Sequence, residues 1–197
     1  MGGATVSDQR QAEDSLVEVR VEIPRGSRNK YEYDPDRQMF RLDRRLFSAT
    51  VYPADYGFVL DTLADDGDPL DALVLVDEPT FPGCLIIVRP VALYRLRDEA
   101  GEDAKLVCVP IGEPAWDHAQ DLDDLPEALL DEIAHFFAVY KTLEPGKGTT
   151  ASGWEDRAAA LQELQDARRR AAANQPAASQ GRQTNRNLPP VDRGPRR

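Results

Sequence analysis

Apolar and polar residues alternate along the first part of the chain as they do in half-buried strands. The strands predicted in this way and from shorter apolar runs span residues 17–23, 29–34, 39–44, 72–76 and 105–110. A longer run at 83–97 is rich in valine, isoleucine and leucine, and Pro90 lies within it. It fits either two strands or one bent strand. We expect the strands to pair antiparallel.

Helical spacing follows in the second half of the chain. An apolar stripe recurs every three or four residues at Leu129, Leu130, Ile133, Phe136, Phe137 and Tyr140. Asp124 and Glu127 fit the N-cap and capping-box positions of this helix. A second, thinner stripe follows a capping box at residues 152–155, and we expect that helix to fray after Arg170. Strands followed by helices predict an α+β protein that is mainly β.

The 197 residues are most simply one domain with two tails. Residues 1–15 lack periodicity and predict a flexible leader, residues 16–173 a folded domain, and residues 174–197 a disordered basic tail. The net charge of −11 argues against general nucleic-acid binding. The arginine-rich tail is the segment that suits contact with a polyanion such as nucleic acid.

Neither export nor membrane insertion is indicated by the sequence. Cys84 and Cys108 lie in apolar, strand-like runs, where buried reduced thiols are favoured over a disulfide. The N-terminus lacks the pattern of a signal peptide, and no apolar run approaches the roughly 20 residues that span a bilayer. These features favour the cytoplasm.

The candidate chemistry centres on an acidic turn at residues 65–71, where four carboxylates surround a glycine and a proline. Carboxylates this dense repel one another and require a positive partner. Oxygen ligands favour Mg²⁺ or Mn²⁺ over zinc. In a second acidic turn, Asp98 and Asp103 are spaced so that they could converge on one ion.

Basic and phenolic side chains lie on the same segments as the acids, at Lys30, Arg44, Lys105, Lys141, Tyr56 and Tyr140. Such groups beside a hard cation are what a phosphate clamp requires. A divalent-cation-binding module without catalysis is the alternative. It would explain the acidic turns but not the basic and phenolic side chains.

The acidic turn, Asp66-Gly67-Asp68-Pro69-Leu70-Asp71-Ala72, resembles the signature of the family I soluble inorganic pyrophosphatases. Other segments resemble that family in the family's order, at residues 21–24, 29–32, 42–44, 52–57, 82–83, 98–105 and 135–141. The resemblance runs from about residue 17 to about residue 170. It is closest to bacterial, actinobacterial-like members.

This resemblance implies a five-stranded, OB-like closed barrel with two principal helices packed outside, assembled as a homohexamer. It implies hydrolysis of inorganic diphosphate to two phosphates by water that several Mg²⁺ ions activate, with Mn²⁺ as an alternative metal. Residues 16–173 would be the pyrophosphatase domain. The leader and the basic tail do not belong to the family pattern.

The resemblance also implies a role for each candidate residue. Asp66, Asp71, Asp98 and Asp103 would bind metal directly, and Glu22 and Glu32 would reach a metal through water. The substrate would be bound by Lys30, Arg44, Tyr56, Lys105, Tyr140 and Lys141. Asp68 is predicted as the general base, with Asp103 as the alternative.

Overall fold

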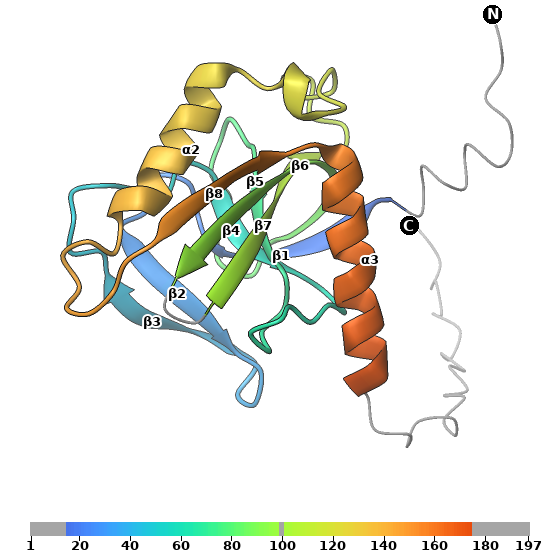
Figure 1. Ribbon diagram of the computed structural model, residues 1–197. Coiled ribbons are helices and arrows are strands. Elements are labelled where there is room, and N and C mark those ends of the chain that lie inside the picture. The colour runs from blue at the N-terminus through green and yellow to red at the C-terminus, as the bar shows by residue number, and fades with distance from the viewer. Residues whose placement is uncertain (1–14, 99–100, 175–197) are drawn as a thin grey trace, which may run out of the picture.

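The computed structural model describes residues 15–98 and 101–174, and Figure 1 shows their course. Its strands are β1 (Val17–Ile23), β2 (Asn29–Asp34), β3 (Met39–Arg45), β4 (Asp55–Val59), β5 (Asp71–Val74), β6 (Leu85–Asp98), β7 (Gly101–Pro110) and β8 (Thr150–Glu155). Its helical elements are the 3₁₀ turn η1 (Leu122–Asp124) and the helices α2 (Glu127–Val139) and α3 (Arg157–Asn174). The predicted leader and tail fall almost entirely outside the described residues, so both stay predictions.

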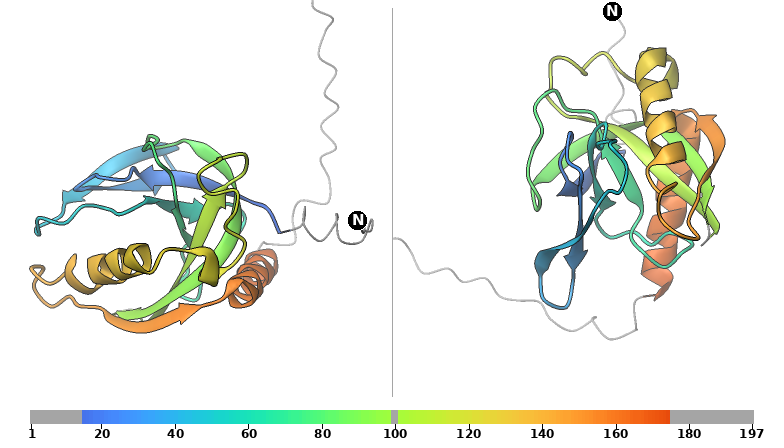
Figure 2. Two further views of the ribbon diagram at one scale, coloured as in Figure 1. Left: turned by 90° about the horizontal axis from the view of Figure 1, so that it is seen from above. Right: turned by 90° about the vertical axis from the view of Figure 1, so that its left-hand side faces the viewer.

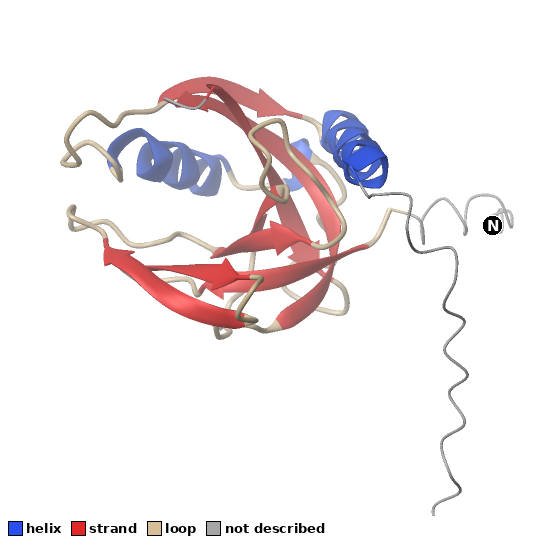
Figure 3. Cartoon of the chain, turned by 90° about the horizontal axis from the view of Figure 1, so that it is seen from below, coloured by secondary structure: helices blue, strands red, loops and turns tan. Residues whose placement is uncertain are grey.

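Five strands close into a ring in the order β1-β4-β5-β7-β6, because β1 pairs antiparallel with both β4 and β6. Figure 3 shows these strands curving around a common interior. β8 extends the sheet beyond β6, and β2 and β3 form a separate two-stranded hairpin. The predicted mainly-β, α+β class and the five-stranded barrel are confirmed.

Two apolar clusters stabilise this arrangement. In the first, side chains from all five ring strands meet three small or aliphatic residues of α3, namely Ala160, Leu164 and Ala167. The second lies beneath α2 and is rich in aromatic rings, with Tyr94 and Phe137 stacked at 5.8 Å between centroids. The two helices lie at separate places along the sheet, as Figure 2 shows. The aromatic cluster also includes Leu46, which directly follows β3, so it lies on the side of the molecule that carries the β2–β3 hairpin.

The helix starts differ from the predictions. The capping box belongs to η1, where Asp121 is the N-cap and Asp124 completes the box, and α2 begins after Pro126 without a side-chain cap. Residues 152–155 are not a capping box either, because they pair with β6 as part of β8. The predicted fraying after Arg170 is wrong. α3 continues to Asn174, and the Arg170 guanidinium anchors that end of the helix to the Leu63 carbonyl.

The strands decide one open alternative and correct two expectations. β6 is one strand with a register shift between Pro90 and Ala92, as expected where proline removes a ladder N–H. β5 and β7 pair in parallel, so the sheet is mixed rather than wholly antiparallel. β7 already begins at Gly101, which places Asp103 and Lys105 within a strand and on the same face.

Both cysteines are free thiols, as predicted, although Cys84 is only half-buried while Cys108 is buried. Within residues 15–98 and 101–174, no helix is both long and apolar enough to cross a bilayer.

Candidate active site

The acidic turn is held by backbone contacts and one buried anchor. Gly67 adopts φ +94°, a conformation that favours glycine, and its N–H donates to the Ala64 carbonyl at 3.2 Å. The Thr62 hydroxyl donates to the Val59 carbonyl at 2.7 Å and accepts from the Leu70 amide at 3.0 Å. Leu70 is fully buried. The turn is thus tied to the core at its end, where β5 begins.

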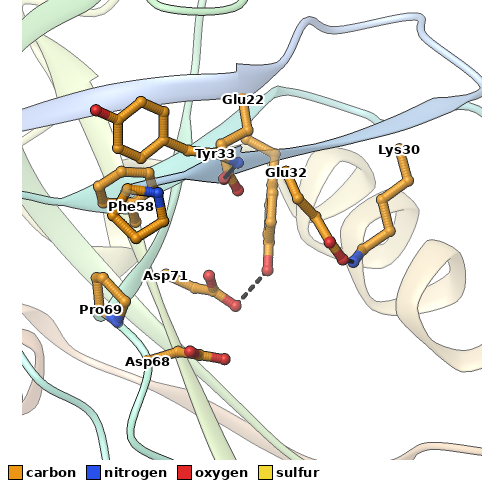
Figure 4. A pocket seen from close by; sticks show the side chains of 10 residues that line it. Glu22, Lys30, Glu32, Tyr33, Phe58, Asp68, Pro69 and Asp71 are labelled. Atoms are coloured by element: carbon orange, nitrogen blue, oxygen red, sulfur yellow. Dashed lines mark hydrogen bonds and ion pairs between the residues drawn. The ribbon is translucent and has the colours of Figure 1, made fainter. Parts of the chain in front are cut away.

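Beside this turn lies a cavity of about 460 Å³. It is lined by four carboxylates, Glu22, Glu32, Asp68 and Asp71, and also by Lys30, Tyr56, Tyr33, Phe58, Pro35 and Pro69. In Figure 4, Asp68 and Asp71 extend in the same direction from the turn, and Lys30 meets Glu32. The cavity therefore combines carboxylate oxygens, which can bind a metal ion, with a cationic side chain, while aromatic rings and prolines form the rest of its wall.

Lys105 lies at the centre of the strongest contacts. Its Nζ donates to Asp71 Oδ2 at 2.7 Å and to the carboxylate of Asp103 at 2.9 Å and 3.0 Å. It also lies 3.0 Å from the Tyr56 hydroxyl, which itself donates to Asp71. Burial alone would lower the pKa of Lys105, but Asp71 and Asp103 outweigh this and hold the pKa above its ordinary value. The ammonium is therefore charged and buried between two carboxylates.

Strand pairing explains why these residues meet. Asp71 and Lys105 are register partners in the parallel β5–β7 pair, and Asp103 is two residues before Lys105 on the same face. Tyr56 comes from β4, which approaches β1 unusually closely at Gly57. A Cβ added to Gly57 would lie 2.0 Å from the Arg20 carbonyl oxygen, so glycine is required there. The site is assembled from strands that are distant in sequence.

Burial and neighbouring carboxylates raise the pKa of two cavity acids, Glu22 and Asp68. Burial raises the pKa of Glu22 to about 7, a hydrogen bond from the Tyr33 amide partly offsets this, and the charge of Asp71 adds to it. Partial burial raises the pKa of Asp68, and Asp66 and Asp71 raise it further. Negative charge is thus in excess in the cavity, which suits a hard cation bound by oxygen.

Two further candidates line the neighbouring surface. Asp66 and Asp103 line a small hollow of about 20 Å³. Asp103 is therefore a neighbour of Asp66 and, through its hydrogen bonds, of Lys105. Among residues 15–98 and 101–174, however, no three acidic, histidine or cysteine side chains are gathered as a ready metal site. The candidate ligands are neighbours, but Asp71 and Asp103 both accept hydrogen bonds from Lys105 instead of facing a common position for a metal ion.

The remaining candidates form ion pairs around the site. Lys141 Nζ lies 2.8 Å from Asp98 Oδ2, and the preceding Tyr140 is buried with its ring stacked on Phe136. On the hairpin, Lys30 pairs with Glu32 at 2.5 Å and lies 3.6 Å from Asp43.

Arg44, the register partner of Lys30, contacts both Asp43 and Glu144. Sequence reasoning missed Asp43 and Glu144, since neither differs by composition or spacing from an ordinary surface acid.

Comparison with known proteins decides the family. The family model of inorganic pyrophosphatase matches residues 19–172. The chain belongs to the inorganic pyrophosphatase family. The inorganic pyrophosphatase of Methanosarcina acetivorans is 54% identical over 158 residues, which is 80% of this chain and 94% of that protein. That of Streptomyces coelicolor is 55% identical over 148 residues, 75% of this chain and 91% of the other.

The fold agrees with this family. The crystal structure of inorganic pyrophosphatase from Thermus thermophilus superposes with a TM-score of 0.79 at 49% identity, covering 80% of this chain and 92% of that one. The resemblance predicted from the sequence motifs is confirmed, including the likeness to actinobacterial members. In this chain, the predicted site residues lie on the acidic turn, the β2–β3 hairpin, β1, β4, the end of β6, β7 and the residues that directly follow α2.

Proposed function

We propose that this chain is an inorganic pyrophosphatase that hydrolyses inorganic diphosphate to two phosphates. The observation that carries the proposal is the carboxylate-lined cavity with Lys105 buried between Asp71 and Asp103, in a chain of this family. Cations must neutralise the negative charge of the diphosphate, and they must also neutralise the charge of the clustered carboxylates. A cavity with both signs of charge suits a substrate that arrives with metal ions.

We infer that the metal is Mg²⁺, several ions to a site, with Mn²⁺ as a substitute. Asp66, Asp71 and Asp103 would hold a first ion, and Asp98 with Asp103 a further one that arrives with the substrate. Glu22 and Glu32 would reach a metal through water. Such cations lower the pKa of water and neutralise phosphate charge. The oxygen-only donors and the mutual repulsion of the acids support this assignment.

The substrate-binding residues would be Lys30, Arg44, Lys105, Tyr140 and Lys141, which donate to phosphate oxygens, and Tyr56, which donates to the leaving phosphate. Lys105 and Lys141 already pair with Asp71, Asp103 and Asp98. A cation bound by those carboxylates would turn the ammonium groups toward the phosphates, since it takes over the neutralisation of the acids. In-line displacement then depends on positioning and charge neutralisation.

Asp68 would act as the general base, with Asp103 as the alternative. A water oxygen forms the new bond to phosphorus, the bridging P–O bond breaks, and the proton of the water passes to the carboxylate. Figure 4 shows Asp68 extending from the turn toward the cavity. Asp103, by contrast, accepts from the Lys105 ammonium through both of its oxygens. A carboxylate not held by an ammonium is the better proton acceptor.

The homohexamer and the cytoplasmic location stay predictions from the sequence. Exposed apolar side chains at Leu85, Ile87 and Ile111 are consistent with a surface that another copy covers, because Ile87 and Ile111 lie beside each other. Sedimentation of the purified protein would measure the assembly directly.

The test of the function is phosphate release from diphosphate. We expect hydrolysis at millimolar Mg²⁺, its loss on adding EDTA in excess, and its return on restoring Mg²⁺. A folded sample that binds Mg²⁺ but leaves diphosphate intact would contradict the proposal. It would instead support the cation-binding module without catalysis.

A further inference from the structure

Glu144 is a buried acid outside the cavity. Its side chain is 5% exposed, and it lies in the loop that follows α2, three residues after Lys141. Its own N–H donates to the Lys141 carbonyl at 2.8 Å, and its carbonyl accepts from the Lys147 amide at 3.2 Å. A buried carboxylate is costly unless it is paired and hydrogen-bonded. Its position therefore depends on its partner.

The main partner is Arg44, one hundred residues earlier in the chain, while the other carboxylate oxygen, Oε2, lies 3.4 Å from the Lys147 ammonium. Glu144 Oε1 accepts from Arg44 Nε at 3.0 Å and from Nη2 at 2.8 Å, so one oxygen spans the side of the guanidinium. Arg44 Nη1 donates to Asp43, and Asp43 also lies 3.6 Å from the Lys30 ammonium. These bonds use three nitrogens of a group with five N–H donors, which leaves donors for phosphate oxygens.

The contact joins two parts of the fold that carry substrate residues. β2 and β3 form a hairpin separate from the ring, and this hairpin holds Lys30 and Arg44. The loop after α2 holds Tyr140 and Lys141. In Figure 1 that loop passes on the side of the molecule where β3 lies. Because Glu144 is bonded to the Lys141 carbonyl and to Arg44, it fixes the two groups of phosphate donors relative to each other.

We propose that Glu144 is a positioning residue for the diphosphate, acting through Arg44. This inference rests on the proposed function, in which Arg44 binds phosphate. Glu144 itself does not touch the substrate. It holds the guanidinium in one orientation, so that less conformational freedom is lost when phosphate binds.

The test is a double-mutant cycle on the KM for diphosphate, with Glu144→Gln, Arg44→Gln and the double variant. We expect Glu144→Gln to raise KM about three- to tenfold with kcat changed less than about twofold, as for the loss of binding that is equal in the ground and transition states. In the Arg44→Gln background, Glu144→Gln should leave KM almost unchanged, because its partner is already gone. Glu132→Gln, an exposed acid on α2, is the matched control and should behave as wild type.

Two results would overturn the inference. One is an unchanged KM in Glu144→Gln. The other is an equal rise in KM with and without Arg44, since that would mean Glu144 acts on the loop alone. If Glu144→Gln does not fold, Glu144→Asp keeps the charge and takes its place in the same cycle. Hydrolysis by the wild type is measured first. Inactivity of the wild type would contradict the proposed function, whereas either of the two results above would contradict only the role of Glu144.

Discussion

At the scale of single residues, Asp68 and Asp71 lie three positions apart on one turn but have different surroundings. Asp71 accepts bonds from the Lys105 ammonium and the Tyr56 hydroxyl. Asp68 is exposed beside the cavity, and its pKa is raised by partial burial and by the charges of Asp66 and Asp71. The first environment, in which two donors orient one carboxylate, suits a metal ligand. The second suits one that accepts a proton.

The two amide variants should therefore fail in different ways. Asp68→Asn cannot accept the proton and should lower kcat by about 10²–10⁴-fold at saturating Mg²⁺, with metal affinity changed less. Asp71→Asn removes a proposed metal ligand and should raise the Mg²⁺ concentration for half-maximal rate, so that added Mg²⁺ restores part of the activity. The measurement is kcat against Mg²⁺ concentration for both variants.

Asp131→Asn, on the exposed face of α2, is the control and should not change either quantity. Rescue of Asp68→Asn but not Asp71→Asn by high Mg²⁺ would show that the two roles are reversed. A metal-insensitive loss in Asp103→Asn would assign the base to β7 instead.

The candidate site residues were selected from the sequence because each stands in a motif whose residue types fit metal and phosphate, and their roles stay predictions. The sequence did not predict that Lys105 would join Asp71 to Asp103. That contact depends on the parallel register of β5 against β7, which sets Asp71 opposite Lys105. Local spacing carries no information about such a pairing. The contact of Glu144 with Arg44 was not predicted for the same reason, since the two residues are one hundred positions apart.

At the scale of elements, α3 is attached to the acidic turn through Arg170 and a backbone hydrogen bond. Arg170 Nε donates to the Leu63 carbonyl at 2.8 Å, and its guanidinium pairs with Asp65 at 3.2 Å and with Glu163 at 2.8 Å. The Leu63 amide in turn donates to the Ala167 carbonyl at 3.0 Å. The helix thus supports the loop from which Asp66, Asp68 and Asp71 extend.

Replacing Arg170 with alanine should loosen that loop. We expect the Mg²⁺ concentration for half-maximal rate to rise about two- to fivefold, because losing about 1 kcal/mol of hydrogen bonding leaves the carboxylates less well placed. The rate at saturating Mg²⁺ should fall less than about twofold, since the reacting groups themselves are unchanged. Arg169→Ala is the matched control, as Arg169 is exposed and pairs with Asp166 within the same helix. The same Mg²⁺ dependence in both variants would contradict the supporting role of Arg170.

Element boundaries were less predictable than element types. Alternation identified β1, β2 and β3, and an apolar stripe identified α2. The cap was misassigned because Asp121, Asp123 and Asp124 all have capping side chains, and the capping box that forms joins Asp121 to Asp124. Residues 152–155 satisfy the sequence pattern of a capping box, yet their pairing with β6 makes them a strand. Capping patterns depend on neighbouring residues alone, so they do not reveal that a segment will pair with a distant strand instead of starting a helix.

At the scale of the whole molecule, the defining feature is ring closure through β1. One strand pairs with both β4 and β6, and the carbonyl of Cys84 accepts from the Val21 amide at 2.9 Å at that junction. Alternating patterns predict strands but not which edges meet, so closure followed from the family resemblance rather than from residues. The turn, β4 and β7 come together because β4, β5 and β7 are consecutive in the sheet, and the pairing of β1 with β6 closes the barrel that carries them.

The chain beyond this barrel should be dispensable for catalysis. The last buried residue of α3 is Ala167, its last side-chain anchor in the described part of the chain is Arg170, and the family match ends at residue 172. A chain ending at Asn174 keeps all of these, so we expect kcat/KM within about twofold of the full-length value and an almost unchanged melting temperature. The removed segment, 175–197, carries five arginines and one aspartate and should account for any salt-dependent retention on a polyanion column. Loss of most activity, or a smaller assembly on sedimentation, would instead show that this segment completes the site or the oligomer.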